Sequence, residues 1–369
     1  MKILVTGAKG FLGKNLVAEL NTTTAHELFE YDLDTPSENL EQWTKECDFV
    51  FHLAGVNRPE NEAEFMEGNF GFTSTLLEQL KKNNNKSPIV LASSTQASLD
   101  NPYGKSKKAG EDLIFNYGKE NKVPVYVYRF TNLFGKWSRP NYNSVVATFC
   151  HKIARDEEIS VNNPNAKLEL CYIDDVIQEL KSALNGNPHF KESFAHVPVT
   201  HQTTVGEIAS LIQAFKNSRK DLSIPDQRDP LSKKLYATYL SYLPEDDFSY
   251  DLKMNIDDRG YFTEFIKSPE RGQVSINYAK PGITKGQHWH HSKNEKFLVV
   301  SGQGMIRFRK YGEDEIIEYP VSGEKLEVVD IPTGYTHSIV NTGNSDMITV
   351  MWANEVYDPE NPDTYYEEV

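Results

Sequence analysis

The amino-terminal stretch Lys2–Gly13, KILVTGAKGFLG, decides the fold of the first part of the chain. A short run of strand character leads directly into glycines with the spacing GxxGxxG, and an amphipathic segment carrying Leu16, Val17 and Leu20 follows. Glycines at this point permit a tight turn, and the free N–H groups at the start of the helix attract a pyrophosphate. The stretch therefore predicts a dinucleotide site. Its predicted contact residues are Gly7, Lys9, Gly10, Phe11, Leu12 and Gly13.

Short apolar runs alternate with helical stretches up to about residue 240. The runs KILVTG, HELFEYD, DFVFHLAG, SPIVLASS and VPVYVYRF are typical of parallel strands joined by helices. After an acidic segment near Pro244, closely spaced strands with Gly or Pro turns follow, as in VSINYAK, KFLVVSG, GMIRFRK and MITVMWA. We therefore expect an α/β Rossmann-type domain over residues 1–243 and an all-β barrel or sandwich over residues 250–369.

Composition excludes several classes of function. The 369 residues are 38% hydrophobic and 25% charged, which is enough apolar material for filled cores. The net charge of −14 and the lack of a basic stripe argue against nucleic-acid binding. No apolar run approaches the roughly 18 residues of a membrane span, and no signal peptide is recognisable, so we expect a cytoplasmic protein without membrane insertion. The cysteines Cys47, Cys150 and Cys171 are widely spaced and are expected only to pack.

Asp32 ends the strand that follows the first helix. It lies 19 residues beyond Gly13, where a carboxylate can accept hydrogen bonds from an adenosine ribose. This position favours NAD over NADP. A neighbouring cation could still accept a 2′-phosphate, and Asp34 could take the place of Asp32, so both cofactors stay open.

A Tyr and a Lys four residues apart carry the predicted reduction chemistry. On a helix this spacing places Tyr103 and Lys107 on one face, so that the ammonium can lower the pKa of the phenol and make it a proton donor. A hydroxyl at the end of the preceding strand, in Ser93–Thr95, can hold a substrate carbonyl while a hydride arrives from nicotinamide.

These motifs together resemble the extended short-chain dehydrogenases/reductases that act on nucleotide sugars. The resemblance rests on GxxGxxG, HLAGVNRP (residues 52–59), SST (93–95), YGKSK (103–107), RFTNLFG (129–135) and IDDV (173–176). It implies a bound nucleotide sugar. It also implies that Ser94, Tyr103 and Lys107 are catalytic, with Thr95 as the alternative to Ser94. Leu53, Ala54, Tyr103 and Lys107 are implied to contact the cofactor, and Thr95, Arg129 and Asn132 to contact the substrate. Ser94 and Tyr103 are only nine residues apart, whereas relatives usually carry a longer insertion.

Three histidines and a glutamate in the second half have the spacing of a metal site. Gly282 is followed by His288, His290, Glu295 and Gly302, and PTGYTHSIVN at residues 332–341 supplies His337. The pattern resembles the two cupin motifs, with Leu326 in place of one expected glycine. It implies one divalent metal held by His288, His290, Glu295 and His337. We favour zinc, although this mixed set would also accept Mn, Fe or Ni.

The same region also resembles the cupin epimerases that invert 4-keto deoxysugar nucleotides. DDRGYFTE at residues 257–264 and GQHW at residues 286–289 carry this resemblance. It implies that His288 is the general base and that Arg259 binds substrate. His290 and Glu295 replace the Gln and Lys of those epimerases, which favours metal binding. His288 can therefore be a ligand, a base, or each in different states.

An extended reductase fused to a metal cupin resembles the bifunctional enzymes of bacterial capsular polysaccharide synthesis. The resemblance implies C3 epimerisation of UDP-2-acetamido-2,6-dideoxy-4-hexulose and then NADPH-dependent reduction to UDP-2-acetamido-2,6-dideoxy-L-talose, a precursor of UDP-N-acetyl-L-fucosamine. Its preference for NADPH, or NADP(H), conflicts with the hint from Asp32. Cupin sheets often pair through edge strands, so we expect a homodimer. Two alternatives remain. One is a nucleotide-sugar 4-ketoreductase whose cupin is structural or dimerising. The other is a sugar-nucleotide sensor without catalytic turnover, but such a sensor would have no use for the intact set of Ser94, Tyr103 and Lys107.

Overall fold

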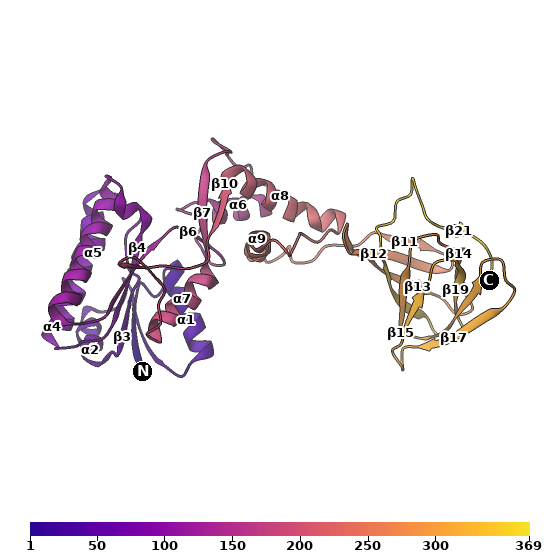
Figure 1. Ribbon diagram of the computed structural model, residues 1–369, viewed down its shortest axis with the longest axis horizontal. Helices are drawn as coiled ribbons and strands as arrows, with labels where there is room; N and C mark the ends of the chain where they lie inside the picture. Colours follow the sequence, from indigo (N-terminus) through magenta and orange to yellow (C-terminus); the bar gives the residue numbers. More distant parts are fainter. The chain divides into compact units, whose positions relative to one another are not determined.

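The computed structural model describes residues 1–369 and divides them into two compact units. The first unit comprises residues 1–213 and 228–244, and the second comprises residues 214–227 and 245–369. Figure 1 shows both units, with the chain coloured by residue number. The first unit is α/β and the second is almost entirely β, which is the order of fold classes expected from the sequence.

The placement of residues 214–227 differs from the expected one. The sequence predicts that they belong to the first domain, whereas the structure places them in the second unit. Backbone hydrogen bonds are the reason. The N–H of Ile224 donates to the carbonyl of Lys267 at 3.1 Å, and the N–H of Lys267 donates to the carbonyl of Leu222 at 2.8 Å. No local pattern in the sequence marks a pairing between segments so far apart.

The first unit is built on a seven-stranded sheet with the order β2-β1-β3-β4-β5-β9-β8. Its strands are β1 (Lys2–Thr6), β2 (Glu27–Tyr31), β3 (Phe49–His52), β4 (Ile89–Ser94), β5 (Val125–Phe130), β8 (Phe190–Lys191) and β9 (Phe194–Ala195). The first five strands of this order are parallel. From β1 the chain goes to one neighbour, β2, and then back to the other, β3. In sheets of this kind a ligand binds at the carboxyl ends of the strands where the winding reverses, here β1 and β3.

Helices cover both faces of this sheet (Figure 1). One layer holds α1 (Phe11–Thr23) and α7 (Ile173–Leu184), and the other holds α2 (Ser37–Glu46), α4 (Phe72–Lys82) and α5 (Pro102–Asn121). Ile3 and Val5 of β1 pack toward the first layer, whereas Leu4 packs toward the second. This alternation with a period of two explains why the strand is apolar throughout.

Helix α5, which carries Tyr103 and Lys107, begins at a well-defined point. The side chain of Asn101 caps it by accepting a hydrogen bond from the N–H of Gly104 at 2.7 Å, and Pro102 occupies the first turn. Both residues are favoured at these positions because the first N–H groups of a helix lack partners within the helix. Between β4 and α5 the only regular element is the short 3₁₀ turn η2 (Thr95–Ser98), so this connection is short, as the spacing of Ser94 and Tyr103 predicts.

The first unit has further elements outside this sheet and its two helix layers. A second sheet has the order β10-β7-β6, and a short helix leads into a π-helical turn, η1, that continues into α4. The remaining elements are α3 (Ala63–Phe65), η1 (Met66–Gly71), β6 (Asn132–Phe134), α6 (Val145–Ala154), β7 (Lys167–Tyr172), β10 (His201–Thr204) and α9 (Pro230–Leu240), and α8 (Val205–Asp221) runs on into residues of the second unit.

The second unit consists of two antiparallel sheets. A six-stranded sheet has the order β11-β12-β13-β20-β15-β18, and a five-stranded sheet has the order β17-β16-β19-β14-β21. The strands are β11 (Met254–Asp257), β12 (Gly260–Ser268), β13 (Gly272–Ala279), β14 (Thr284–Trp289), β15 (Glu295–Ser301), β16 (Gln303–Lys310), β17 (Ile316–Ser322), β18 (Val328–Ile331), β19 (Tyr335–Asn341), β20 (Met347–Ala353) and β21 (Tyr365–Tyr366). Phe297 and Met347 from the first sheet meet Ile306, Phe308 and Ile339 from the second in one core.

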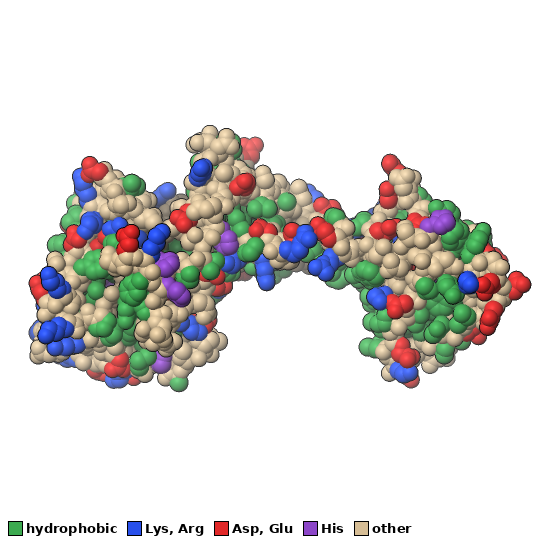
Figure 2. Space-filling model, in the orientation of Figure 1, with side chains coloured by type: hydrophobic (Ala, Val, Ile, Leu, Met, Phe, Trp, Pro, Cys, Tyr) green, Lys and Arg blue, Asp and Glu red, His purple; other side chains and the backbone are tan.

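None of the helices combines the length and the apolarity that a membrane crossing requires. Acidic and basic side chains are interspersed over the face of both units that Figure 2 draws. The three cysteines Cys47, Cys150 and Cys171 are buried and unpaired. Burial raises the pKa of the Cys47 thiol to about 11, so this group stays protonated and packs as a small apolar side chain.

Candidate active site and metal centre

The glycine-rich turn at the end of β1 is packed so closely that side chains would not fit. Gly7 has a φ of +71°, and a Cβ at this residue would lie 2.7 Å from the backbone nitrogen of Ala54. A Cβ at Gly13 would lie 2.1 Å from the carbonyl oxygen of Gly7. Gly10 stands at the amino-terminal cap of α1 without a capping side chain. The turn thus leaves bare backbone at a helix amino terminus, which suits the pyrophosphate of a dinucleotide.

Replacing Gly13 by alanine is expected to weaken cofactor binding by roughly tenfold or more, because the clash with Gly7 must open the turn. Titration of the intrinsic fluorescence with NADPH measures this. Gly71→Ala is the matched control, since Gly71 has an ordinary helical φ of −61° and its added Cβ would have its nearest neighbour at 3.8 Å. Equal losses of NADPH affinity in the two variants would contradict the assignment of the glycine-rich turn as the cofactor site.

Asp32 lies beside this turn, at the end of β2. One oxygen of its carboxylate accepts a hydrogen bond from the N–H of Lys9 at 2.7 Å, and the other accepts one from the N–H of Leu33 at 2.8 Å. The ammonium of Lys9 forms an ion pair with Asp34, and both side chains are exposed. A carboxylate and a cation are therefore both present where the adenosine ribose is expected.

The three residues of the predicted reduction site come together between β4 and α5. Ser94 is the last residue of β4, and its hydroxyl is hydrogen-bonded to the phenol of Tyr103. The Nζ of Lys107 is buried, donates to the carbonyl of Ala92 at 3.1 Å and lies 5.9 Å from the centroid of the Tyr103 ring. The structure thus gathers a hydroxyl, a phenol and an ammonium at the carboxyl end of β4.

The electrostatics of this site differ in one respect from the expectation. Burial raises the pKa of Tyr103, and the hydrogen bond with Ser94 opposes this effect without cancelling it. Lys107 does not bring the pKa of the phenol below its usual value, and its ammonium donates to the carbonyl of Ala92. Burial also lowers the pKa of Lys107 itself, to about 8. The phenol therefore carries its proton at neutral pH, which is the form that a proton donor needs.

Asn57 is a site residue that sequence reasoning missed. Its side-chain carbonyl accepts the hydrogen bond of the Tyr103 hydroxyl at 2.8 Å. The segment before it is fixed by Asn69, whose side chain accepts from the N–H of Val56 at 2.9 Å and donates to the carbonyl of Val56 at 3.0 Å. Asn57 belongs to the HLAGVNRP motif, but nothing in that motif indicates a contact across 46 residues.

The predicted substrate residues are distributed over different elements. Thr95 begins η2 directly after Ser94, and Asn132 begins β6 and is exposed. The Nε and Nη2 atoms of Arg129 donate hydrogen bonds to the carboxylate of Glu111 at 2.8 and 2.6 Å. A substrate could therefore be bound only by the N–H groups of the guanidinium that Glu111 does not use. Arg259 lies in the second unit, where it pairs with Asp257.

Four predicted ligands converge in the second unit. One ligand atom from each of His288, His290, Glu295 and His337 can be chosen so that all four lie within 4.8 Å of one another. The Oε2 of Glu295 lies 3.6 Å from the Nε2 of His290 and 3.5 Å from the Nε2 of His337. These distances exceed those of good hydrogen bonds, and all three atoms are buried without a hydrogen-bond partner. Buried polar atoms of this kind are costly unless something binds them.

A β-bulge directs His288 into this cluster. Gly286 of β14 lies opposite Ser338 of β19, so regular pairing would place Gln287 opposite His337. Instead Gln287 adopts a φ of +65° and the register shifts, so that His288 lies opposite His337. Because opposite residues of antiparallel strands point to the same face, the shift turns the imidazole of His288 toward that of His337.

Backbone carbonyls orient the three imidazoles. The Nδ1 of His290 donates to the carbonyl of Asp363, and the Nδ1 of His337 donates to the carbonyl of Tyr335 at 3.4 Å. His288 forms a backbone hydrogen bond with Gly286. A neutral imidazole that donates through one nitrogen presents a lone pair on the other. The arrangement thus fits a cation held by imidazole nitrogens and one carboxylate.

The ionisation states agree with this fit. Burial, together with the charges of His337 and His290, lowers the pKa of His288 to about 4. Burial opposes ionisation of Glu295, but its interactions with His290 and His337 are stronger and hold the pKa of this carboxyl well below its usual range. A neutral imidazole at His288 and an ionised carboxylate at Glu295 are forms that bind divalent metals.

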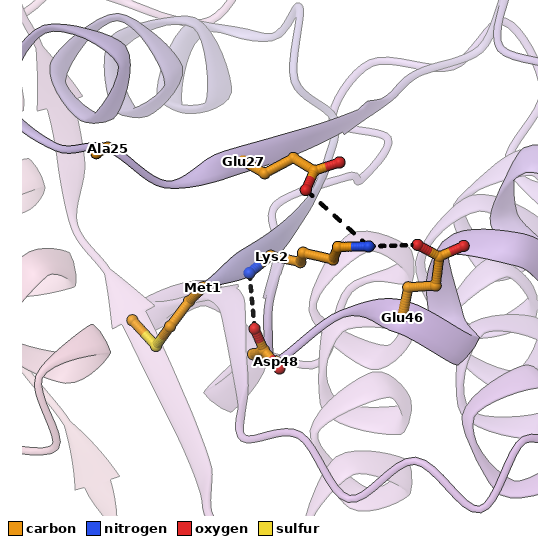
Figure 3. Close-up of a pocket in the computed structure, with 6 residues that line it drawn as sticks. All are labelled: Met1, Lys2, Ala25, Glu27, Glu46 and Asp48. Carbon is orange, nitrogen blue, oxygen red and sulfur yellow. Dashed lines mark hydrogen bonds and ion pairs between the residues drawn. The ribbon is translucent and has the colours of Figure 1, made fainter.

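A surface hollow of about 510 Å³ lies elsewhere, at the amino-terminal edge of the parallel sheet (Figure 3). In it the ammonium of Lys2 lies 2.6 Å from Glu46 and 4.0 Å from Glu27, and Asp48 accepts from the N–H of Lys2. Ligands of such sheets bind at the opposite, carboxyl edge. This hollow is therefore separate from the predicted site.

Comparisons with known proteins cover the whole chain. Residues 3–191 match the model of the NAD dependent epimerase/dehydratase family, and residues 255–365 match that of the polysaccharide biosynthesis C-terminal domain. A curated relative from Pseudomonas aeruginosa, UDP-2-acetamido-2,6-beta-L-arabino-hexul-4-ose reductase, is 46% identical over 99% of this chain and 98% of its own length. The chain belongs to the NAD dependent epimerase/dehydratase family.

Solved structures extend this likeness. The crystal structure of CapF from Staphylococcus aureus, a capsular polysaccharide assembling protein, has 57% identity, a TM-score of 0.96 and full coverage of both chains. A Bacillus cereus UDP-glucuronic acid 4-epimerase with NAD has only 20% identity, covers 59% of this chain and 83% of its own, and with a TM-score of 0.53 shares the fold alone. The resemblance to a protein of bacterial capsular polysaccharide synthesis is thereby confirmed.

Membership of the NAD dependent epimerase/dehydratase family also bears on the first unit. The glycine-rich turn and the cluster of Ser94, Tyr103 and Lys107 both lie within the range that this family's model matches, residues 3–191. A nicotinamide cofactor is therefore supported. The cluster of His288, His290, Glu295 and His337 lies in the range of the second model, residues 255–365.

Proposed function

We propose that the chain is a bifunctional nucleotide-sugar enzyme of polysaccharide biosynthesis. In this proposal the second unit inverts C3 of UDP-2-acetamido-2,6-dideoxy-4-hexulose. The first unit then reduces the C4 ketone with NADPH and yields UDP-2-acetamido-2,6-dideoxy-L-talose, a precursor of UDP-N-acetyl-L-fucosamine. The observation that carries the proposal is the presence in one chain of a reductase cluster and an unsatisfied histidine and glutamate cluster. The name of the P. aeruginosa relative, a hexul-4-ose reductase, supports the substrate.

Reduction requires a hydride at C4 and a proton at the ketone oxygen. The nicotinamide supplies the hydride when it is bound. The Ser94 hydroxyl positions the ketone, and Tyr103 delivers the proton from its phenol. The ketone oxygen would replace the side chain of Asn57 as the acceptor of that proton. Lys107, buried behind the phenol with a pKa lowered to about 8, stabilises the phenolate that results.

The cluster in the second unit is proposed to hold one divalent metal, with zinc as the first choice and Mn, Fe or Ni as alternatives, in a domain of the cupin class. His290, His337 and Glu295 present three buried ligand atoms that nothing else satisfies, and His288 completes the set. When bound, such a metal stabilises negative charge on a nearby oxygen.

Epimerisation at C3 uses the acidity that the C4 ketone confers on the adjacent C–H bond. A base removes the C3 proton, the electron pair passes toward the ketone oxygen, and a proton returns from the opposite face. His288 is the proposed base if it does not act as a ligand. Reduction of the C4 ketone then removes the acidifying group, so the new configuration can no longer revert. Epimerisation therefore precedes reduction.

NADPH is the proposed cofactor, with NADH as the alternative. The exposed ammonium of Lys9 stands next to Asp32 and Asp34 and can pair with a 2′-phosphate. Both carboxylate oxygens of Asp32 already accept hydrogen bonds from backbone N–H groups, which makes Asp32 less available to a ribose hydroxyl. Initial rates with the two reduced cofactors decide the choice. A homodimer is proposed because cupin sheets often pair through edge strands, and a cytoplasmic location is proposed on the sequence features described above.

Deuterium exchange tests the epimerase half directly. The 4-keto sugar nucleotide is incubated with the metal-loaded protein in heavy water, without a nicotinamide cofactor. We expect deuterium at C3, detected by NMR, because proton removal at C3 needs no hydride. A chain without epimerase activity would leave C3 protonated, and oxidation of NADPH by the same substrate would then identify a simple 4-ketoreductase.

That simpler enzyme is the second candidate, and one observation favours it. Four protein ligands can fill a tetrahedral zinc site completely, as in zinc sites that serve only to hold a fold. In that case the second unit would be structural or would form the dimer. Metal removal would lower the melting temperature but would leave reduction unchanged.

A further inference from the structure

The end of the chain returns to the cluster of His288, His290, Glu295 and His337. Strand β21 (Tyr365–Tyr366) pairs with the end of β14, with Tyr366 opposite His288 and Tyr365 opposite Trp289. Figure 1 draws β21 beside β14 in the second unit. The short strand covers what would otherwise be the open edge of the five-stranded sheet.

The carboxylate of Asp363 caps the loop between two ligands. It accepts hydrogen bonds from the N–H groups of His291, Ser292 and Lys293 at 2.9, 2.7 and 2.8 Å, and from the Ser292 hydroxyl at 3.0 Å. These residues lie between His290 and Glu295.

The backbone of Asp363 acts on a ligand itself. Its carbonyl accepts from the Nδ1 of His290, so the Nε2 of that ring carries the lone pair that points toward Glu295. The side chain of Asp363 holds the loop while its carbonyl holds the ring. One residue thus fixes both the path of the chain around His290 and the tautomer of its imidazole.

The last three residues support the other two histidines. Glu367 accepts from the hydroxyl of Thr336, the neighbour of His337, at 2.9 Å. The N–H of Glu367 donates to the carbonyl of Gln287, the bulge residue before His288, at 3.1 Å. The N–H of Val369 donates to the Gln287 side chain at 2.9 Å. Residues 363–369 therefore touch each histidine of the cluster or its immediate neighbour.

We propose that residues 363–369, called here the carboxyl-terminal strap, position the metal centre, with Asp363 as the main positioning residue. The inference rests on the metal site proposed above. It implies reciprocal coupling: the strap strengthens metal binding, and bound metal holds the strap in place. Residues that orient metal ligands typically contribute roughly 10- to 100-fold in metal affinity.

The test compares Asp363→Ala with Asp358→Ala in the full-length protein. Asp358 lies in the same terminal segment, but its carboxylate accepts only from Glu360 and Asn361 of its own turn. Affinity for Zn²⁺ is measured by competition with a chromophoric chelator, and the coordination is probed by the visible absorption of bound Co²⁺. We expect Asp363→Ala to bind Zn²⁺ roughly 10- to 100-fold more weakly with an altered Co²⁺ spectrum, and Asp358→Ala to match wild type.

A second measurement guards against simple unfolding. Asp363→Asn keeps an oxygen acceptor and should recover part of the affinity. Hydrogen exchange at residues 291–293 and 365–367 should slow when Zn²⁺ is added to the wild-type protein and should change less in Asp363→Ala. Equal Zn²⁺ affinities of Asp363→Ala and Asp358→Ala would overturn the role of the strap and leave the metal site intact. Failure of the wild-type protein to bind Zn²⁺ or Co²⁺ would overturn the metal site itself.

Discussion

Substitution of Tyr103 by phenylalanine is expected to slow reduction of the C4 ketone by roughly 10²- to 10⁴-fold, the usual contribution of a positioned proton donor. Deuterium incorporation at C3 should continue at the wild-type rate, because the second unit performs that exchange without the phenol. The change removes one oxygen and leaves the ring, which packs against Phe65. Oxidation of NADPH at 340 nm and NMR of the sugar measure the two activities separately.

Tyr117→Phe is the matched control for this experiment. Tyr117 lies on the same helix, α5, and its hydroxyl donates to the carbonyl of Asn85 at 3.1 Å, away from the reduction cluster. The substitution should cost about 1 kcal/mol of stability, the usual contribution of one hydrogen bond, and should leave both activities unchanged. Full reduction activity in Tyr103→Phe would show that another group supplies the proton.

Substitution of His290 by alanine is expected to have the opposite effect. It removes one buried ligand and leaves the carboxylate of Glu295 with one fewer partner. Affinity for Zn²⁺ should therefore fall by more than the roughly 10- to 100-fold expected of a residue that only supports a ligand. Exchange at C3 should be lost, whereas reduction of a sugar that is already epimerised should persist, since the reduction cluster lies in the first unit.

His291→Ala provides the control for His290→Ala. Its imidazole is exposed and contacts Trp289 and Tyr365 outside the cluster, and its bond to Asp363 uses only the backbone. Metal content by mass spectrometry and exchange at C3 should both match wild type. Loss of metal with retained exchange in His290→Ala would favour a structural metal and leave His288 to act as base alone.

The sequence was most informative where the chemistry depends on local spacing. The glycines at positions 7, 10 and 13 and the pair Tyr103 and Lys107 need only one turn or one helix to come together. The histidines at positions 288 and 290 likewise share a side because they are two residues apart at the end of a strand. Such periodicities are properties of the backbone, so they can be read without knowing the rest of the fold.

Other features required contacts between distant segments. The hydrogen bond of Tyr103 to Asn57, the pairing of Arg129 with Glu111, and the placement of residues 214–227 in the second unit have no local signature. The sequence also assigned Lys107 the lowering of the phenol pKa. Burial decides that pKa instead, and burial depends on everything that packs around a side chain.

By itself, then, the amino-acid order determined two domains of different class, the turn that suits a pyrophosphate, and the identities of the four candidate ligands. Only the tertiary structure decided how those ligands meet. A single-residue bulge at Gln287 turns His288 toward His337, and Asp363, more than 70 residues from His290 along the chain, orients its ring. A one-residue shift reverses the face of every following side chain in a strand. Neither this shift nor the hydrogen bond between Asp363 and His290 leaves a periodic pattern in the sequence from which it could be predicted.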